Sequence, residues 1–287
     1  MTRTFSSRFL LPFCVSAILL ACGGDDGGAV AGDNTPYTSD PDKTVVVGGA
    51  GASTASGSTA GTAQPSAGCV TLPSGECVDA KSCAPGERRD VVVDSKGSVV
   101  AVVCYPANAS PPVINSEGDV SLNKNENNGV IAIDGAADGV DIKGNVVAAG
   151  NNVVVYGEGP AVSVIGGNVD SGGNNFSLRG VTVQGTVHIV GNNATLVLCS
   201  IEGNVVFEGN NNVIANCSIL GSVEIKGVNN TLVSNQIGGQ ISVGADKNTV
   251  CDGNVVWSDA NANRVFDAGE AGAAITCGGT AAGPGKK

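Results

Sequence analysis

The stretch "GNNATLVLCSIEGNVVFEGNNNVIANCSILGSVEIKGVNNTLVSNQI" (residues 191–237) decides the fold, because it says nearly the same thing two and a half times. Alignment at a spacing of 18 residues puts asparagines in one column and glycines in two others. The columns are Gly173, Gly191, Gly209 and Gly227; Asn175, Asn193, Asn211 and Asn229; and Gly185, Gly203, Gly221 and Gly239. A fixed period of this length indicates a solenoid, in which each repeat packs only against its neighbours.

Apolar residues fill four further columns of the same alignment. β-Branched side chains dominate them, and segments such as "SVEIKG" alternate with period two, which favours strands over helices. We therefore predict an all-β parallel β-helix (β-solenoid) with 18-residue coils, with strands stacked roughly 4.8 Å apart and asparagine amides bonded along the axis. The glycine column that begins at Gly185 is expected at corners that need positive φ. The apolar columns are Leu178, Leu196, Ile214, Leu232 and Val250; Val183, Ile201, Ile219, Ile237 and Val255; Val187, Val205, Val223 and Ile241; and Ile189, Phe207, Ile225 and Val243.

The handedness of the coil follows from where the first apolar column points. A left-handed helix of hexapeptides places an inward residue at every sixth position, and this would leave the column that begins at Leu178 exposed. The "N-x-I-x-x-N-x-I" text of "NNVIANCSI" and "NNTLVSNQI" instead resembles right-handed parallel β-helices of the pectate-lyase-like class. The resemblance covers roughly residues 113–256 and implies architecture. Because many members of that class are polysaccharide lyases or hydrolases, it also supplies the alternative function.

Candidate catalytic residues are sparse in the repeats. The single histidine, His188, alternates with inward residues and is expected to point outward, and Arg179 stands isolated. Glu202, Glu208 and Glu224 are scattered over several coils, whereas carbohydrate cleavage needs a paired acid and base. We therefore predict a non-enzymatic module, structural or adhesive.

One column of the repeats carries hydroxyl groups, and Trp257 stands at the expected end of the stack. A regular array of hydroxyl groups is suited to binding carbohydrate, another protein or ice, although stacked threonines also simply suit β structure. Trp257 replaces a glycine of the corner column and is expected to cover the open end. The hydroxyl column is Ser177, Thr195, Thr231 and Thr249, interrupted by Val213.

The N-terminus reads as an export signal. Arg3 and Arg8 precede an apolar run over residues 9–20, which is too short to span a bilayer. The run ends in "LLAC", which resembles a bacterial lipobox, so residues 1–21 are a predicted signal peptide and Cys22 the lipid-attachment site; an ordinary signal peptide is the alternative. The resemblance implies a lipoprotein of the bacterial outer membrane or cell surface, whose partner is the membrane.

Loss of this leader changes the charge balance. Removing Arg3 and Arg8 leaves 13 basic residues against 26 acidic ones, or a net charge of −13. Such a chain repels phosphate backbones, so no nucleic-acid partner is expected.

Two segments separate the leader from the repeats. Residues 22–68 are rich in glycine, alanine, serine and threonine and are predicted to be a disordered linker, in which "KTVVVGG" is the only candidate strand. Residues 69–110 form a small module with a hairpin pattern and four cysteines, Cys69, Cys77, Cys83 and Cys104. An exported segment of this size favours two disulfides, with all three pairings open, and the short paired spacings of a zinc site are absent.

Four later cysteines are also candidates for disulfides. Cys199 and Cys217 stand one coil apart in one column, so they are either bonded across coils or buried as thiols. Cys251 and Cys277 bracket the segment that follows the repeats, and a bond between them would close it.

That segment, "DANANRVFDAGE" (residues 259–270), resembles an EF-hand calcium loop. The resemblance assigns oxygen ligands to positions one, three, five, seven, nine and twelve and so implies a calcium ion that stabilises the end of the solenoid. Arg264 departs from the pattern, which has glycine there, and a plain acidic turn is the alternative. The β-helix is thus bounded at 111–258, the loop at 259–270 and a C-terminal tail at 271–287. The implied ligands are Asp259, Asn261, Asn263, Val265 (through its carbonyl), Asp267 and Glu270.

Overall fold

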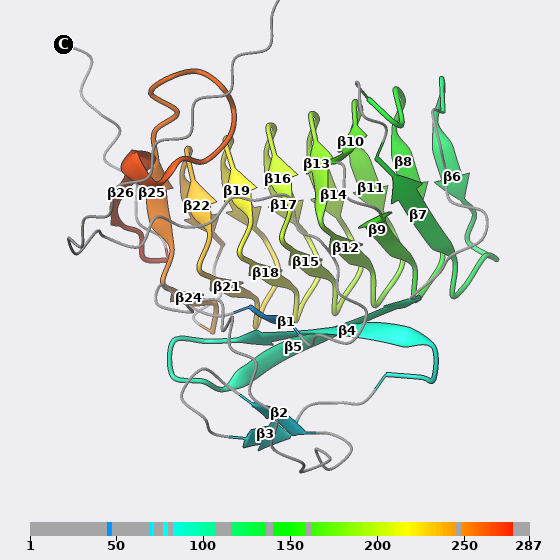
Figure 1. Ribbon diagram of the computed structural model, residues 1–287, viewed down its shortest axis with the longest axis horizontal. Helices are drawn as coiled ribbons and strands as arrows, with labels where there is room; N and C mark the ends of the chain where they lie inside the picture. The colour runs from blue at the N-terminus through cyan, green and yellow to red at the C-terminus, as the bar shows by residue number, and fades with distance from the viewer. Residues whose placement is uncertain are drawn as a thin grey trace, which may run out of the picture. The chain divides into compact units, whose positions relative to one another are not determined.

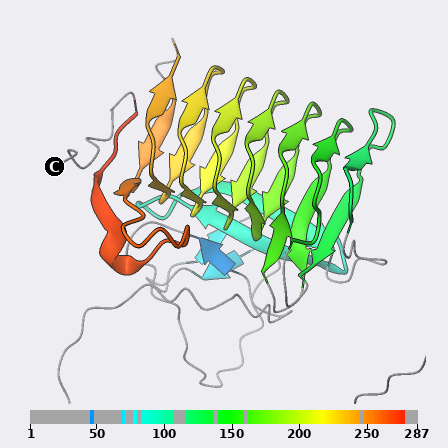
Figure 2. The same ribbon diagram turned by 90° about the horizontal axis from the view of Figure 1, so that it is seen from above.

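The protein is described by a computed structural model. It describes residues 83–106, 116–135, 140–158, 162–244 and 248–277, together with the backbone of three short strands at 45–47, 69–71 and 77–79. Within these residues the fold is all-β apart from one 3-10 turn, η1 (Ala268–Glu270). Parallel coils stack into a β-solenoid of the right-handed type, which Figures 1 and 2 show from two sides. The predicted fold class is confirmed.

Three seven-stranded sheets form the walls of the solenoid. From β8 to β25 each coil contributes one strand to each sheet, and β26 is added antiparallel to sheet II after the last coil. Sheet I contains β7 (Val130–Asp134), β9 (Val154–Glu158), β12 (Ser177–Arg179), β15 (Thr195–Val197), β18 (Val213–Ala215), β21 (Thr231–Val233) and β24 (Val250–Asp252). Sheet II contains β10 (Ser163–Ile165), β13 (Val181–Val183), β16 (Ser200–Ile201), β19 (Ser218–Ile219), β22 (Gln236–Ile237), β25 (Val255–Trp257) and β26 (Ala271–Ala274). Sheet III contains β6 (Val120–Leu122), β8 (Val146–Ala148), β11 (Val169–Ser171), β14 (Val187–Ile189), β17 (Val205–Phe207), β20 (Val223–Ile225) and β23 (Ile241–Val243).

The register confirms the 18-residue period in the middle of the stack and corrects it in the last coil. Leu178, Leu196, Ile214 and Leu232 pair in succession, each 18 residues after the one before. Leu232 then pairs with Cys251, so the last coil of sheet I is one residue longer. Cys251 therefore takes the place predicted for Val250, which is half exposed.

The same extra residue shifts two other predicted columns. Ile237 pairs with Val256 rather than Val255, and Thr231 pairs with Val250 rather than Thr249. The register of β22 and β25 places Trp257 opposite Gly238, one position before the glycine column to which the sequence assigned it. A one-residue insertion moves every later side chain to another column, and a fixed period cannot anticipate it.

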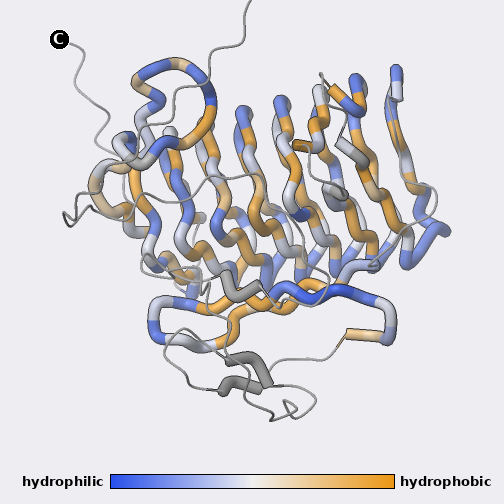
Figure 3. Tube along the Cα trace, in the orientation of Figure 1, coloured by the Kyte–Doolittle hydropathy of each residue, from blue (hydrophilic) through white to orange (hydrophobic). Residues whose placement is uncertain are grey.

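Residues of the inward columns form the core. The column that begins at Leu178 is fully buried through Leu232, which excludes the hexapeptide alternative that would expose it. Phe176 and Phe207 are the largest side chains of the same core and are fully buried. Apolar residues recur along each coil in Figure 3.

The corner glycines are required for a different reason from the predicted one. Gly203 and Gly221 do not have positive φ. A Cβ on either would collide with the backbone carbonyl of the glycine one coil earlier, because the coils stack in register. Positive φ falls instead on the asparagine column, including Asn193 and Asn211, since asparagine tolerates the left-handed conformation better than most residues.

A hairpin outside the solenoid covers sheet I. Its strands β4 (Glu87–Val93) and β5 (Val99–Pro106) pair antiparallel, and β1 (Val45–Val47) pairs parallel with β4. β1 lies in the predicted linker, which is otherwise outside the described residues. A two-stranded pair, β2 (Cys69–Thr71) and β3 (Cys77–Asp79), precedes the hairpin. Hairpin residues such as Val92 and Val103 share one buried cluster with Val197, Ala215 and Val233 of sheet I, so the expected separate module packs on the solenoid.

The C-terminal end of the solenoid is closed by residues expected to form a tail. β26 adds antiparallel to β25, and Ile275 is buried against the core. Ile275 N donates to the Asn254 carbonyl at 2.8 Å, which fixes this segment to the last coil. Trp257 is also buried, and it contacts the following loop: its ring packs edge-on against Phe266, and Nε1 donates to Glu270 Oε2.

Candidate functional site

The predicted calcium loop connects β25 to β26 at this capped end. Residues 259–267 form a series of bends, and η1 closes the segment. The loop arches beyond the coils in Figure 1, between the labels β25 and β19. It is thus placed at one end of the stack, where the sequence predicted it.

The oxygen-bearing side chains of the loop converge. Asn263 N donates to Asp259 Oδ1 and to Asn261 Oδ1, both at 3.0 Å. Asp267 Oδ2 accepts from Asn261 Nδ2 at 2.8 Å and from Asn263 Nδ2 at 3.0 Å. Asn263 Oδ1 in turn accepts from Val265 N at 2.8 Å. Four of the six predicted ligands are therefore gathered around one small volume of the loop.

Arg264 adopts the conformation for which the EF-hand pattern uses glycine. Its φ is +60°, and its backbone N–H donates to Asp259 Oδ2 at 3.1 Å. The sharp turn at position six is thus present although the residue there carries a side chain. A left-handed conformation costs a non-glycine residue about 1–2 kcal/mol, so other contacts of Arg264 must offset this cost.

Glu270 closes the loop on itself. Its Oε1 accepts from Ala260 N at 2.9 Å, and its Oε2 accepts from Trp257 Nε1 at 2.9 Å and Asp267 N at 3.2 Å. The indole hydrogen bond, assisted by the backbone ones, lowers the pKa of this carboxyl group. Glu270 is therefore ionised at neutral pH and holds both ends of the loop together.

The donor set fits a hard cation. Asp259, Asp267 and Glu270 supply carboxylate oxygens, and Asn261 and Asn263 supply amide oxygens, which are the ligands that Ca²⁺ takes in proteins. Both carboxylate oxygens of Asp259 and the Oε1 of Glu270 accept one hydrogen bond each, so each retains a further lone pair for coordination. The residues present are thus chemically suited to calcium.

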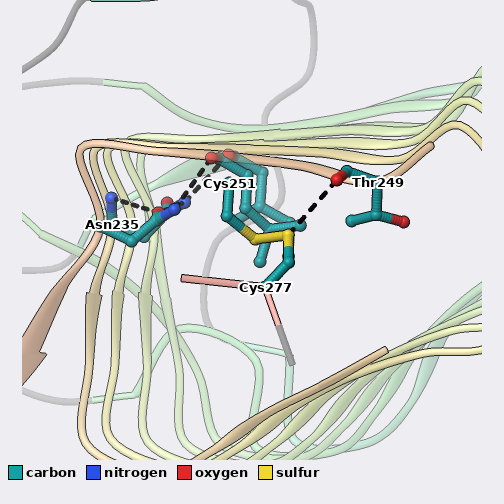
Figure 4. The surroundings of a disulfide bond; sticks show 7 residues. Asn235, Thr249, Cys251 and Cys277 are labelled. Atoms are coloured by element: carbon teal, nitrogen blue, oxygen red, sulfur yellow. Dashed lines mark hydrogen bonds between the residues drawn. A yellow bond between two sulfur atoms is a disulfide. The ribbon is translucent and has the colours of Figure 1, made fainter. Parts of the chain in front are cut away.

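The predicted Cys251–Cys277 disulfide is present and ties the segment after the loop to the last coil. Its Cα atoms lie 5.4 Å apart, and Cys277 Sγ is 3.4 Å from the Thr249 carbonyl, as Figure 4 shows. Beside it, Asn235 Nδ2 donates to Asn254 Oδ1 at 2.8 Å within the core. The loop is thus held at both ends, by β25 and by a covalent bond.

The remaining cysteines divide into a bonded pair and two thiols. Cys83 and Cys104 form a disulfide that closes the open end of the hairpin, and the side chains of Cys69 and Cys77 lie outside the described residues, as does Cys22. Cys199 and Cys217 are buried and free, which resolves the two sequence alternatives in favour of thiols. Cys199 N lies 3.4 Å from Cys217 Sγ, in the column that continues with Asn235. Burial raises the pKa of Cys217 well above its usual range.

Sheet III carries a row of ionisable side chains on its outer face. His188 points outward as predicted, with Nδ1 3.5 Å from Asp170 Oδ1 and Nε2 3.5 Å from Glu208 Oε1. Lys226 Nζ lies 3.1 Å from Glu208 and 4.0 Å from Glu224, and hydrogen bonding to Lys226 lowers the pKa of Glu208. Glu208, which looked isolated in the sequence, therefore forms a cross-coil ion pair with Lys226, and Glu224 lies beside the same lysine within one coil.

Sheet I, in contrast, holds a buried ion pair that the sequence did not predict. Arg179, expected to be isolated, pairs through Nε with Asp90 Oδ2 of the hairpin, and its guanidinium lies 4.2 Å from the centroid of the Tyr105 ring. Burial raises the pKa of Asp90, although Arg179 acts in the opposite direction. The sequence does place Asp90 directly before the apolar run "VVV", which hints that this aspartate is buried. No local pattern, however, identifies Arg179 as its partner.

A second group of potential metal-ligating side chains lies at the hairpin, and its chemistry differs from that of the loop at residues 259–270. Cys83, Glu87 and Cys104 bring their ligand atoms within 4.8 Å of one another. The two sulfur atoms are bonded to each other, so they offer no thiolate to a metal.

Among the described residues no helix has the length and hydrophobicity to cross a bilayer.

Comparison with known proteins returned no similarity: no family model, curated protein or solved structure matches this chain.

Proposed function

We propose that this chain is a lipoprotein of the bacterial outer membrane or cell surface that presents a non-catalytic β-solenoid, structural or adhesive, stabilised by calcium. The observation that carries the proposal is the loop at residues 259–270. Four oxygen-bearing side chains converge there, and Arg264 takes up the glycine conformation of an EF-hand turn. A calcium ion at the capped end would stiffen the module against unfolding from that end.

The loop residues have distinct roles in this proposal. Asp259, Asn261, Asn263 and Asp267 would hold the ion with side-chain oxygens, and Val265 with its carbonyl oxygen. Glu270 already accepts hydrogen bonds from both ends of the loop, so it orients the segment and adds negative charge. The bound ion would offset the repulsion among three carboxylates.

A melting experiment on the full-length chain tests the calcium proposal. At 10 mM calcium and an extracellular-type affinity of about 10⁻⁴ to 10⁻³ M, binding adds about 1.4–2.7 kcal/mol of stability. This corresponds to a rise in Tm of about 3–10 °C relative to chelator. Magnesium is the matched control ion, because it demands a smaller octahedral shell. The variants Glu270→Gln and Asp259→Asn should lose the shift, and an equal Tm in calcium and chelator for the unaltered chain would refute calcium binding.

The lipid anchor rests on the sequence of the leader. The apolar run and "LLAC" before Cys22 support export and acylation. Cys22→Ser should move the protein from the membrane fraction to the soluble fraction in a bacterial host. Retention of the variant in membranes would argue for another mode of attachment.

The hairpin leaves sheet III uncovered, and we assign ligand presentation to the outer face of this sheet. Sheet I is covered, whereas the outer residues of sheet III, such as His188 and Glu224, are partly or fully exposed. A carbohydrate or protein ligand would therefore meet sheet III. Glycan-array binding that depends on His188 or Glu224 supports this assignment, and binding that depends on Thr195 and Thr231 of sheet I instead would contradict it.

One observation favours the alternative, a polysaccharide lyase or hydrolase of the right-handed β-helix class. Asp170, Glu208 and Glu224 lie on one face with His188 among them. Against it, Glu208 and Glu224 flank the same lysine, and hydrogen bonding to Lys226 lowers the pKa of Glu208, whereas a general acid needs a raised pKa. Cleavage of acidic or neutral polysaccharides that disappears in Glu208→Gln would establish the enzyme.

A further inference from the structure

The guanidinium of Arg264 contacts a distant coil of the solenoid. Arg264 Nη1 lies 2.7 Å from Glu202 Oε2, and the Glu202 side chain is only 15% exposed. Glu202 follows Ile201, which pairs in succession with Ile219, Ile237 and Val256. The loop that leaves the last coil at Trp257 therefore reaches back over three coils.

The conformation of Arg264 and this contact depend on each other. The loop turns at Arg264 because its φ is +60° and its N–H bonds to Asp259, a predicted ligand. Glycine would adopt this conformation without strain, but it has no side chain to reach Glu202. The loop thus accepts a strained backbone at a residue that joins the ligand cluster to a coil three coils away.

We propose that the loop is a calcium-dependent strut, in which Glu202 acts as a positioning residue for the calcium site from three coils away. This inference rests on the proposed calcium binding. Calcium fixes the turn at Arg264, and the fixed turn holds the guanidinium on Glu202. The ion thereby braces the last three coils of sheet II as well as the loop itself.

Coupling of this kind is reciprocal. If calcium strengthens the Arg264–Glu202 contact, the contact must strengthen calcium binding by the same factor. A partly exposed ion pair contributes modestly, so the expected factor is about two- to fivefold in Kd. The effect is small enough to leave the fold intact and large enough to measure.

The test is a double-mutant cycle on the calcium affinity of the full-length chain. Affinity is measured by isothermal titration calorimetry, with the emission of Trp257, the single tryptophan of the chain, as a second readout. Glu202→Gln should weaken calcium binding about two- to fivefold. In the Arg264→Gly background the same substitution should have no effect, because the partner is gone.

Glu224→Gln is the matched control, since Glu224 pairs with Lys226 on sheet III, away from the loop. It should leave the calcium affinity unchanged. Normal calcium binding that Glu202→Gln does not alter would overturn the strut and leave the calcium proposal standing. Absence of calcium binding by the unaltered chain would overturn both.

Discussion

Arg179 and His188 lie nine residues apart on one coil, yet their surroundings differ completely. Arg179, on sheet I, is buried against Asp90 and Tyr105 of the hairpin. His188, on sheet III, is 36% exposed and lies between two surface carboxylates. The inward residues beside them, Leu178 and Val187, are equally buried. The repeat therefore determines which side chains are buried in the core. Whether the hairpin covers a sheet determines how far the outward-facing side chains of that sheet are exposed.

Removal of Arg179 from sheet I is expected to lower the unfolding free energy far more than removal of a charged side chain from sheet III. Arg179→Met leaves Asp90 buried without its partner, which should cost about 3–5 kcal/mol of unfolding free energy. Because burial raises the pKa of Asp90 in the fold, a proton on Asp90 is tolerated there, and the loss should shrink as the pH is lowered. Urea denaturation at pH 7 and pH 4 measures both effects.

The control for this variant lies on sheet III. Lys226→Met removes an exposed cation from the Glu208 pair and should lower the unfolding free energy far less than Arg179→Met does, because solvent screens the exposed pair. The double variant Asp90→Asn with Arg179→Met should recover much of the loss. Equal effects of Arg179→Met and Lys226→Met would mean that the hairpin does not bury sheet I in solution.

Two valines offer a matched apolar pair for the same comparison. Val197 and Val206 both point outward from one coil, Val197 under the hairpin with 0% exposure and Val206 on sheet III, partly exposed. Val197→Ala should cost about 2 kcal/mol through lost burial and a residual cavity. Val206→Ala should change the unfolding free energy by less than about 0.5 kcal/mol. Chemical denaturation of the two variants side by side checks this, and the reverse order would be incompatible with the packing described.

The smallest expected effect concerns the edge of the covered sheet. Asp252 accepts a hydrogen bond from Ser95 N at the hairpin turn, and its bonds to Ser95 lower its pKa. A lowered carboxyl pKa stabilises the fold above the unfolded value of about 3.9 and loses this contribution as the pH falls. Asp252→Asn should therefore cost about 1 kcal/mol at pH 7, and this penalty should shrink as the pH falls below about 3.9. A penalty that does not change with pH in the acid range would show that charge on Asp252 is not responsible.

The sequence predicted the structural features that recur every 18 residues and missed those that occur only once. The buried column that begins at Leu178 follows from the 18-residue spacing, and the convergence of four loop side chains was predictable from the resemblance to an EF-hand loop. The extra residue before Cys251 and the docking of Asp90 on Arg179 were not, because a single insertion and a contact between distant segments leave no periodic trace. The 18-residue period located the corner glycines, but the reason predicted for them, a positive φ, was wrong. Their role depends on the close approach of the backbone carbonyl of the neighbouring coil.

Amide hydrogen exchange with and without calcium tests the central claim, that calcium stiffens the capped end of a β-solenoid. In 10 mM calcium, relative to chelator, we expect slower exchange over residues 259–270, over β26 and around Ile275. Exchange in β8 and β11, several coils away from the cap, should stay the same in both conditions. Identical exchange in the loop and in β26 with and without calcium would contradict the account.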